Sequence, residues 1–317
     1  MKSQKKIIIL SQNLQGGGAE RFCVNLGNEL SSLGHNVQLL ILDDSNSNLI
    51  KKISKKINLL SLGTINARYS ILSLIKHLKK TKPDIIISNQ RHINFLLILT
   101  MFFCKFKCKY FIREAASPSI EIKQKKFFYM IISKIFIRLL YRKVYKIISP
   151  TYEIKNDLIN EFGIKEDKIL VLNNSINFDE IFSLSNNKDT SFSNFDYNKD
   201  YIISIGRLTK QKNYLHLLNC FSVILKHHDI NLLILGEGED RKKIEKKVKE
   251  LGIEGKVLMP GHIENPYFYL KRAKIFVLTS IYEGMPNVLL EATSSNLQII
   301  SSDCPTGPRE ILDNGKW

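Results

Sequence analysis

The feature that most limits how this chain can fold is a series of twelve short apolar runs, which are rich in Ile, Leu and Val and are separated by longer segments. Seven come first, at residues 6–10, 37–42, 57–60, 84–88, 109–112, 146–149 and 169–172, and five follow, at residues 201–205, 231–235, 256–259, 275–279 and 298–301. The segments between them include helical patterns at residues 19–33, 71–80, 214–227 and 241–251. Alternating helices and almost wholly apolar strands indicate parallel sheets covered by helices on both faces.

A polar segment divides the pattern into two blocks. Residues 173–199 are rich in Asn, Ser and Asp and lack clear periodicity, so they are expected to form a linker. The fold class predicted is α/β, with two Rossmann-like domains facing across a cleft: an N-terminal acceptor domain at residues 1–172 and a C-terminal donor domain at residues 200–317. In such sheets ligands bind beyond the carboxyl ends of the strands, so site residues are sought there.

Composition narrows the classes of partner. The formal net charge of +17 over 317 residues favours anions such as nucleic acid, anionic lipid or phosphorylated small molecules. Much of the excess is lysine spread along the chain, which a biased genome composition also produces. Five cysteines without a CxxC pair indicate neither a disulfide framework nor a zinc site, and fit a reducing cytoplasm. The apolar run near the start is too short for a signal peptide, and the longest apolar stretch, residues 93–104, is too short to span a bilayer.

The first strand is followed by three glycines that precede a helical pattern. Gly16, Gly17 and Gly18 let the backbone approach a ligand, and the helix after them presents free N–H groups, a setting that suits phosphate. A glycine turn before a helix is also common without a ligand. The loop lacks the spacing of a dinucleotide fingerprint and the Lys-Ser/Thr of a P-loop.

Cations and glycines follow the strands of the second block. Gly206 and Arg207 leave the strand at 201–205, and Lys212 stands five residues after Arg207, a pair of cations that suits a diphosphate. Solvated surface cations are the alternative in so basic a chain. Gly236 and Gly238 follow the next strand, and His262 follows the one after it, where a histidine is more often a surface residue than a catalyst.

The segment SIYEGMPNVLLEA places two carboxylates around a predicted helix start. Glu283 lies in the loop after the strand at 275–279, Pro286 suits the first turn of a helix, and Glu291 lies on that helix. Each carboxylate can accept hydrogen bonds from vicinal hydroxyls on either side of a bound phosphate. A sugar nucleotide has that layout. The alternative is a pair of glutamates that only cap and solvate the helix.

Six segments together resemble the retaining glycosyltransferases of family four, which have the GT-B fold: GGGAER, SIGRLTKQKN, LGEGEDR, PGHIENP, TSIYEGMPNVLLEA and DCPTGPREIL. The resemblance covers nearly the whole chain and is densest from Tyr201 to Leu312. It implies an enzyme that transfers a hexosyl or N-acetylhexosaminyl group from a nucleotide-sugar, by family frequency a UDP-sugar, to a glycan or lipid-linked saccharide of the bacterial cell surface. It implies no metal and no other cofactor.

The resemblance also implies roles for the residues quoted above. Arg207 and Lys212 would hold the donor diphosphate, Glu283 would contact the transferred sugar, and Glu291 would bind the ribose. The glycine loop at Gly16–Gly18, the strand-end residues Gly206, Gly236, Gly238 and His262, and the segment Gly284, Met285, Pro286, Asn287 and Val288 would complete the donor site. Attack on the same face as the leaving phosphate is the favoured mechanism, so Glu283 is not expected to act as a covalent nucleophile.

The chain departs from this family in two places. Many members carry a first-domain histidine near the reacting sugar, where this chain reads FIREAASP, so His92, Arg113 and Glu114 become the acceptor-side candidates. The chain ends at Trp317, where relatives continue, so the donor domain is expected to be incomplete. A truncated protein that binds the nucleotide-sugar without transferring the sugar is the alternative function.

Residues 121–148 predict contact with a membrane surface. Lys134, Arg138, Arg142 and Lys146 recur every four residues and would form a basic stripe on a helix that is otherwise largely apolar. Such a helix can lie on an anionic bilayer, at the inner face of the cell membrane, or it can pack in the core with a solvated basic face. No recognition helix or aromatic-basic motif points to nucleic acid, and no GxGxxG motif points to an oxidoreductase.

Overall fold

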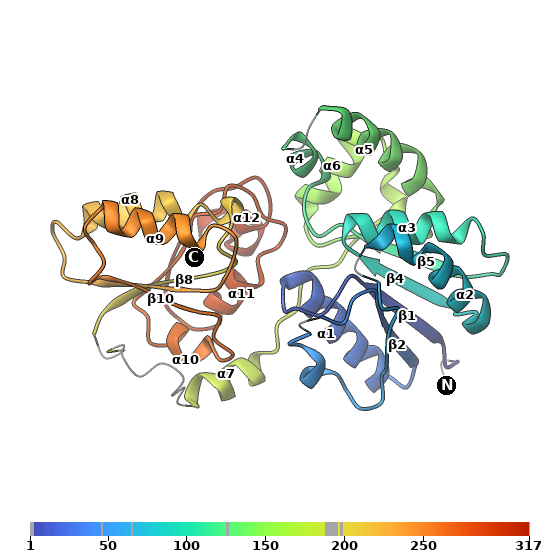
Figure 1. Cartoon of the computed structure of the whole chain (residues 1–317), viewed down its shortest axis with the longest axis horizontal. Coiled ribbons are helices and arrows are strands. Elements are labelled where there is room, and N and C mark those ends of the chain that lie inside the picture. Colours follow the sequence, from blue (N-terminus) through green and yellow to red (C-terminus); the bar gives the residue numbers. More distant parts are fainter. Residues whose placement is uncertain are drawn as a thin grey trace. The chain divides into compact units, whose positions relative to one another are not determined.

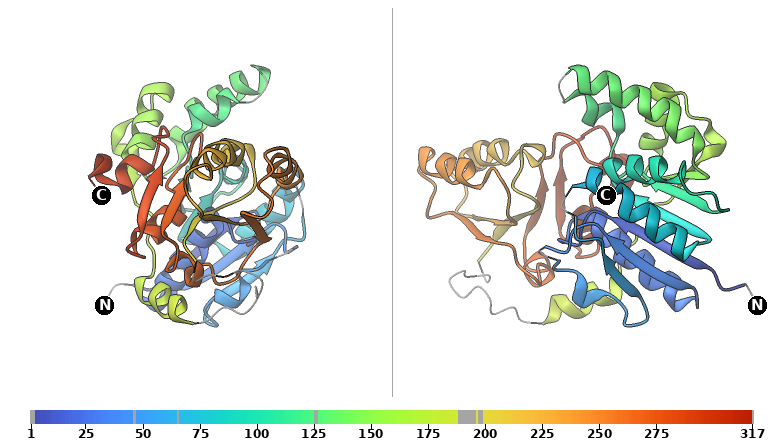
Figure 2. Two further views of the ribbon diagram at one scale, coloured as in Figure 1. Left: turned by 90° about the vertical axis from the view of Figure 1, so that its left-hand side faces the viewer. Right: turned by 45° about the vertical axis from the view of Figure 1, so that its right-hand side comes forward.

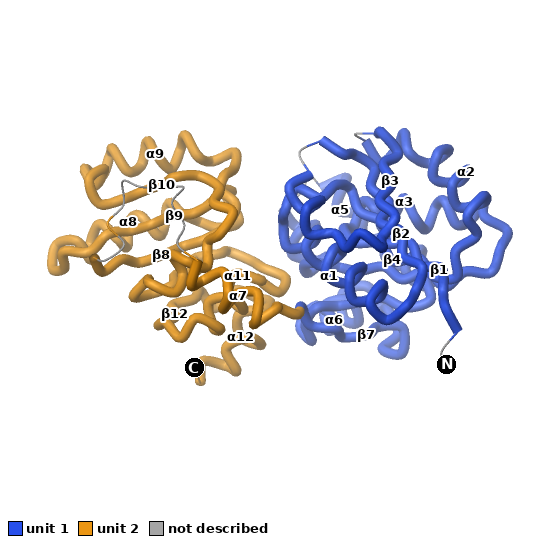
Figure 3. Tube along the Cα trace, turned by 90° about the horizontal axis from the view of Figure 1, so that it is seen from below, with its two compact units in different colours: residues 1–174 blue, residues 175–317 orange. Residues whose placement is uncertain are grey.

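The computed structural model describes residues 3–45, 47–64, 66–124, 127–187, 196 and 199–316. The chain divides into two compact units, Met1–Asn174 and Ser175–Trp317, which Figure 3 shows in separate colours. Each unit is built around its own parallel sheet.

Unit 1 contains a seven-stranded sheet in the order β3-β2-β1-β4-β5-β6-β7, in which all paired strands are parallel. Figure 1 labels β1, β2, β4 and β5 of this sheet. Its strands are β1 (Lys6–Ser11), β2 (Asn36–Ile41), β3 (Asn58–Ser61), β4 (Ile85–Asn89), β5 (Lys109–Arg113), β6 (Lys146–Ser149) and β7 (Ile169–Val171). Its described α-helices are α1 (Gly18–Ser32), α2 (Ile71–Thr81), α3 (Arg91–Met101), α4 (Pro118–Lys123), α5 (Phe127–Leu140) and α6 (Tyr152–Phe162).

Strand alternation in β1 explains why both faces of this sheet are covered. Ile7 and Ile9 pack into a cluster with Cys23 and Val24 of α1. Their neighbours Ile8 and Leu10 pack into a second cluster with residues of α2, α3, α5 and α6 on the opposite face. Figure 2 shows these helices on the two sides of the sheet.

Unit 2 contains a five-stranded parallel sheet in the order β10-β9-β8-β11-β12. Its strands are β8 (Tyr201–Ile205), β9 (Asn231–Leu235), β10 (Val257–Gly261), β11 (Ile275–Leu278) and β12 (Gln298–Ser301). Its described α-helices are α7 (Phe178–Asn186), α8 (Tyr214–Ile224), α9 (Arg241–Glu250), α10 (Tyr267–Leu270), α11 (Asn287–Thr293) and α12 (Pro308–Ile311). Helices α8 and α9 pack on one face, and α10 and α11 on the other.

The predicted fold class is confirmed, since both blocks form parallel sheets with helices on both faces. All twelve predicted strands are present, and their ends differ from prediction by at most two residues. The agreement follows from the apolar runs, because a strand buried on both faces is apolar at nearly every position.

The predicted linker at 173–199 differs from the structure over part of its length. Residues 178–186 form α7, whose start is capped by Asn177: its side-chain oxygen accepts from the backbone N–H of Glu180 at 3.1 Å. Ile181 is buried, and α7 packs against α10. A single buried turn gives too few apolar positions for periodicity to reveal the helix. Residues 188–195, 197 and 198 of the predicted linker lie outside the described residues.

The predicted basic stripe at 121–148 is wrong as a single helix face. The segment divides into α4, α5, a 3₁₀ turn at Tyr141–Lys143 and strand β6, so Lys146 belongs to the sheet; residues 125 and 126 lie outside the described residues. Arg138 donates to the carbonyl of Glu161 at 3.1 Å, near the carboxyl end of α6. The basic side chain of Arg138 thus compensates a negative helix end within the molecule.

Candidate active site

The site of unit 2 lies where the strand order of its sheet reverses, between β8 and β11. Ligands of open α/β sheets bind at such reversals. The loops that leave these two strands are joined by hydrogen bonds: the N–H of Ile281 donates to the carbonyl of Gln211 at 2.8 Å, and the hydroxyl of Thr279 donates to the carbonyl of Lys212 at 3.0 Å. The topology thus brings two segments about 70 residues apart in sequence into one surface.

Lys212 and Glu283 form an ion pair at the centre of these loops. Lys212 Nζ lies 2.5 Å from Glu283 Oε1, and the two side chains are 12% and 8% exposed. The hydroxyl of Ser280 donates to the same oxygen at 2.5 Å. Glu283 Oε2 has a longer contact of 3.4 Å with Gln211 Nε2, so it is the less engaged of the two oxygens.

The charge of Glu283 affects two neutral neighbours. Burial raises the pKa of the Cys304 thiol to about 11, and the carboxylate of Glu283 adds to that increase. Burial also raises the pKa of the Tyr214 hydroxyl, with Glu283 again a smaller cause. Both groups therefore stay neutral near pH 7, and Lys212 is the cation in contact with Glu283.

The other predicted strand-end residues lie at the surface of unit 2. Arg207 is exposed, and no ion-pair partner for it occurs among the described residues. His262 is also exposed, at the end of β10. The guanidinium of Arg207 is thus exposed in the same connection that carries Lys212. A cation that binds an anion from solvent must be exposed in this way.

Glu291 is buried on α11, eight positions after Glu283, with 6% of its surface exposed. The hydroxyl of Tyr267 donates to Glu291 Oε1 at 3.2 Å. The segment between the two glutamates turns at the start of α11: Gly284 is buried, Pro286 is the residue before the helix, and Val288 packs against the core. The backbone of this segment, rather than the side chain of Val288, is therefore the part that fits the predicted ligand role.

Gly236 and Gly238 have a structural reason that the sequence did not reveal. A Cβ on Gly236, whose φ is +141°, would lie 2.0 Å from the carbonyl oxygen of Gly206, and one on Gly238 would lie 2.3 Å from that of Leu208. The loops after β8 and β9 therefore pack backbone against backbone. The close packing of these two loops therefore requires glycine at both positions, whether or not the glycines also contact a ligand.

In unit 1 the first turn of α1, which follows the glycine loop, is hydrogen-bonded to the end of β4 and the residue after it. The side-chain amide of Asn89 donates to the carbonyl of Ala19 at 2.5 Å, and that of Gln90 donates to Glu20 Oε1 at 2.8 Å. A Cβ on Gly17 would lie 2.4 Å from Glu20 Oε2, so the carboxylate lies beneath the loop. Strands β1 and β4 flank the reversal of this sheet, and the loop at Gly16–Gly18 lies at the ligand-binding position of the fold.

Arg113 is a buried cation rather than a surface ligand. Its side chain is 2% exposed, lies 4.2 Å from the ring centre of Phe22, and donates to Asn89 Oδ1 at 3.0 Å and to Asn174 Oδ1 at 2.7 Å. Burial lowers its pKa to about 10. Arg113 therefore holds Asn89 at the end of β4, and Asn89 in turn holds the first turn of α1 after the glycine loop.

Glu114 is also buried, and both of its oxygens are occupied. Oε2 accepts from Arg91 Nη2 at 2.9 Å, and Oε1 accepts from Asn94 Nδ2 at 3.2 Å and from the hydroxyl of Tyr141. Of the three acceptor-side candidates, only His92 is exposed, with Nε2 3.2 Å from Gln12 Oε1. His92 thus lies at the surface of unit 1, whereas Arg113 and Glu114 lie in its interior.

Sequence reasoning did not select Ser280, Gln211 or Tyr267. Ser280 stands three residues before Glu283, and Gln211 precedes Lys212, so both were close enough to have been considered. Tyr267 is 24 residues from Glu291, and only the packing of α10 beside α11 reveals their contact.

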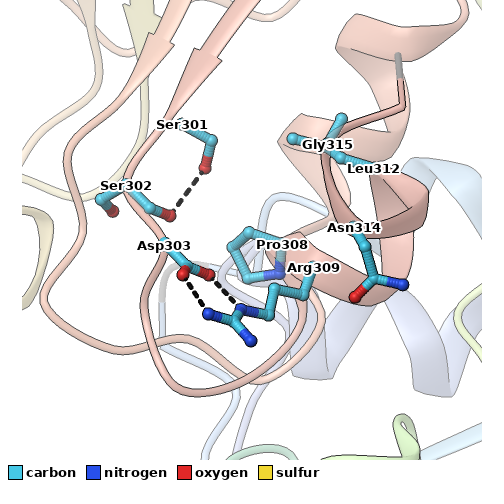
Figure 4. Close-up of a pocket in the computed structure, with 8 residues that line it drawn as sticks. All are labelled: Ser301, Ser302, Asp303, Pro308, Arg309, Leu312, Asn314 and Gly315. Atoms are coloured by element: carbon cyan, nitrogen blue, oxygen red, sulfur yellow. Dashed lines mark hydrogen bonds and ion pairs between the residues drawn. The ribbon is translucent and has the colours of Figure 1, made fainter.

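A separate pocket of about 360 Å³ lies at the end of β12, and Figure 4 shows the side chains around it. It is lined by Ser301, Ser302, Asp303, Pro308, Arg309, Leu312, Asn314 and Gly315. Within it Arg309 Nε donates to Asp303 Oδ1 at 2.6 Å. None of the predicted site residues lines this pocket, so it is distinct from the Lys212–Glu283 site.

Family models match both parts of the chain. The model described as Glycosyltransferase Family 4 matches residues 16–180, and the model described as Glycosyl transferases group 1 matches residues 185–317. The first match covers more than half of the chain, and together they leave few residues unmatched. The two matches divide the chain at about the same place as its two compact units.

Two curated relatives and one solved structure illustrate the similarity. An uncharacterised glycosyltransferase of Methanocaldococcus jannaschii is 33% identical over 83% of this chain and 66% of its own length. The N-acetylgalactosamine-N,N'-diacetylbacillosaminyl-diphospho-undecaprenol 4-alpha-N-acetylgalactosaminyltransferase of Campylobacter jejuni is 28% identical over 99% of this chain and 85% of its own. The Anabaena protein HepE, solved in complex with UDP and glucose, has a TM-score of 0.76 at 12% identity and covers 98% of this chain and 83% of its own. The chain therefore belongs to glycosyltransferase family 4 and is a glycosyltransferase with the two-domain GT-B fold.

Proposed function

We propose that this enzyme transfers a hexosyl or N-acetylhexosaminyl group, with retention of anomeric configuration, from a UDP-sugar to a lipid-linked saccharide. The observation that carries the proposal is the buried Lys212–Glu283 ion pair at the reversal of the unit 2 sheet. Two similar proteins support the choice of donor and acceptor class: HepE was solved with UDP and glucose, and the Campylobacter relative is named for its action on a diphospho-undecaprenol saccharide.

The donor diphosphate is assigned to the cations of unit 2. Arg207 is exposed and without an ion-pair partner among the described residues, and Lys212 has a largely buried side chain whose ammonium group carries three donors. A cation in a partly buried site stabilises the charge that develops on a leaving diphosphate more strongly than one in water. In this account Arg207 attracts the donor and Lys212 stabilises the leaving group.

The two glutamates are assigned to hydroxyl groups. Glu283 keeps Oε2 largely free to accept from the transferred sugar, because Oε1 is occupied by Lys212 and Ser280. Glu291 would accept from the ribose hydroxyls. Gly284–Val288 would contribute backbone amides to the sugar and phosphates, and Gly16–Gly18 of unit 1 would contribute theirs to the phosphates.

The reaction is a substitution at the anomeric carbon on a single face. The bond from that carbon to the phosphate oxygen breaks, and a bond to the acceptor hydroxyl oxygen forms on the same face. The acceptor proton passes to the departing phosphate, which leaves as UDP. Glu283 stabilises the positive charge on the sugar and forms no covalent bond. We propose that no metal ion takes part, since Arg207 and Lys212 supply positive charge at the diphosphate.

Unit 1 is proposed to bind the acceptor. His92 is the candidate to contact it, because its imidazole is exposed while Arg113 and Glu114 are buried. Arg113 holds Asn89, and Asn89 holds the first turn of α1. We assign these two side chains to support of the site rather than to contact with the acceptor.

Helix α5 is proposed to hold the enzyme at the cytoplasmic face of the membrane. Its exposed side chains include Phe128 (74%), Ile135 (48%) and Leu139 (60%), which lie on one face at helical spacing. No helix in the described part of the chain is long and apolar enough to cross a bilayer. Exposed aromatic and aliphatic residues on a helix flanked by cations suit the interface of an anionic bilayer.

Flotation with vesicles of anionic phospholipid tests this membrane assignment. The wild-type protein is expected to float, and the Phe128→Ser, Ile135→Ser double variant to remain at the bottom of the gradient. Phe178→Ser is the matched control, since Phe178 is equally large and 63% exposed but lies on α7 of unit 2. Equal flotation of the double variant and the control would contradict the assignment.

The proposed reaction is tested by incubating the protein with UDP-sugars and a bacterial membrane lipid extract, with EDTA present. Radiolabel is expected to move from one UDP-sugar into lipid, and the new linkage to have the anomeric configuration of the donor. Inverted configuration in the product, or a requirement for added metal, would contradict the corresponding part of the proposal.

A further inference from the structure

Ser280 contributes a buried hydroxyl to the site. It is 2% exposed and follows β11 by two residues. Its Oγ donates to Glu283 Oε1 at 2.5 Å, and its own carbonyl accepts from the hydroxyl of Ser302 at 2.6 Å. Ser280 is therefore fixed at both its side chain and its backbone.

Two donors of different mobility share one oxygen of Glu283. Lys212 Nζ reaches Oε1 on a flexible four-carbon chain, whereas Ser280 Oγ is one bond from its Cβ and cannot move far. In the proposed function Lys212 also stabilises the donor diphosphate. Each shift of the ammonium group toward phosphate weakens its hold on Glu283.

We propose that Ser280 is a positioning residue, which keeps the Glu283 carboxylate aligned while Lys212 engages the leaving diphosphate. The inference rests on the proposed function of Lys212 and Glu283. With Oε1 held by Ser280, Oε2 stays directed to its ligand at every stage of the reaction, independent of Lys212. The hydroxyl thus acts through Glu283 and does not itself contact the donor.

Tyr267 provides a comparison for Ser280, because each donates a hydroxyl hydrogen bond to one of the two glutamates. Its hydroxyl donates to Oε1 of the other glutamate, Glu291, at 3.2 Å. Ser280→Ala and Tyr267→Phe each remove one hydroxyl from one carboxylate, and neither adds an atom that must be accommodated. The two variants should differ in which step they affect, because Glu283 is assigned to the reacting sugar and Glu291 to the ribose.

The test measures UDP release from the selected UDP-sugar with a membrane lipid extract as acceptor, together with the Kd of UDP. Ser280→Ala is expected to lower kcat about 10- to 100-fold with an unchanged Kd, while Tyr267→Phe is expected to act chiefly by raising Kd. Ser280→Thr, which keeps the hydroxyl, should restore kcat.

The outcomes separate this inference from the function on which it rests. Wild-type kcat in Ser280→Ala, alongside an inactive Glu283→Gln, would overturn the role of Ser280 alone. Full activity of Glu283→Gln would overturn the proposed function and the inference with it. If Ser280→Ala does not fold, the Ser280→Thr variant decides: loss of kcat with its hydroxyl present would also overturn the role of Ser280.

Discussion

The ammonium group of Lys212 and the carboxylate of Glu283 lie 2.5 Å apart, although 71 residues separate them in sequence. The contact exists because β8 and β11 are neighbours in the sheet and their loops leave at the same edge. It joins the two residues for which the sequence predicted separate roles, one toward phosphate and one toward sugar. The proposed reaction depends on this ion pair, so substitutions in it test the proposal directly.

Replacing Lys212 by Met is expected to lower kcat about 10²- to 10³-fold, because a preorganised charge at the leaving group would be lost. Lys210→Met is the matched control, since Lys210 is an exposed lysine of the same 3₁₀ turn, Lys210–Lys212, and should leave kcat near the wild-type value. Steady-state kinetics of UDP release provide the measurement. Equal kcat for the two variants would remove Lys212 from the mechanism.

Replacing Glu291 by Gln is expected to weaken UDP binding about 10- to 100-fold, because hydrogen bonds to a charged acceptor are stronger than those to a neutral one. Isothermal titration calorimetry of UDP is the measurement. Glu254→Gln, at an exposed position after α9, is the control and should bind UDP as the wild type does. A Glu291→Gln variant with wild-type affinity would disprove the ribose assignment.

The two carboxylates that contact Arg91 should differ in their effect on stability. Glu114 has 1% of its side chain exposed, and Glu114→Gln, which leaves Arg91 without its buried partner, should cost about 3–5 kcal/mol of unfolding free energy. Glu121 lies 2.9 Å from Arg91 with 37% exposed, and Glu121→Gln should cost less than about 1 kcal/mol. Urea denaturation followed by circular dichroism compares them. Similar costs would show that Glu114 is not a structural anchor of unit 1.

Gly236→Ala should destabilise unit 2 by about 2 kcal/mol or more, since the new Cβ meets the carbonyl of Gly206 and φ is +141°. Gly255→Ala is the control, because a Cβ there has no heavy atom within 4 Å. Thermal denaturation measures both. If Gly236→Ala melts with the control, the close packing of the loops after β8 and β9 is incorrect.

Stability should fall as the pH rises from 8 to 10. Burial raises the pKa of Cys23 from 9.0 to about 11, and that of Cys304 likewise to about 11. Between these values the unfolded chain releases thiol protons that the folded chain retains, so stability present below pH 9 is lost above it, at about 1 kcal/mol per pH unit for Cys23. The lowered pKa of Arg113 has the opposite effect, and only above about pH 10.

The alkaline effect is checked by melting temperatures at pH 8, 9 and 10 for the wild type and for the Cys23→Ala, Cys304→Ala double variant. The double variant should show a smaller decrease over this range, whatever its absolute stability. An identical decrease in both proteins would exclude the two thiols as its cause.

The strands were predictable because the central strands are buried on both faces and read as short, almost continuous apolar runs, whereas helices show apolar residues on one face only. The residues at the strand ends followed from the same pattern, since parallel strands place their following loops at one edge. Lys212 and Glu283 could thus be assigned to one site, but their direct contact could not, because strand order depends on which strands pair.

The failures have equally specific causes. The four-residue spacing of Lys134, Arg138, Arg142 and Lys146 continues through a 3₁₀ turn into β6, so a helical period crossed elements that are not helical. Arg113 and Glu114 remain acceptor-side candidates, but their burial was not predictable, because Asn89, Arg91 and Tyr141, which bond to them inside unit 1, are distant in sequence or topology. Only tertiary packing supplies those partners.

The most direct test of the proposed donor site is a thermal-shift measurement, without metal, on the wild type and on Glu291→Ala. The ligands are UDP, GDP and ADP and their sugars. UDP and a UDP-sugar are expected to raise the melting temperature of the wild type, and Glu291→Ala is expected to lose this shift. An equal shift in the variant, or no shift with any of these nucleotides, would contradict the donor site proposed around Lys212, Glu283 and Glu291.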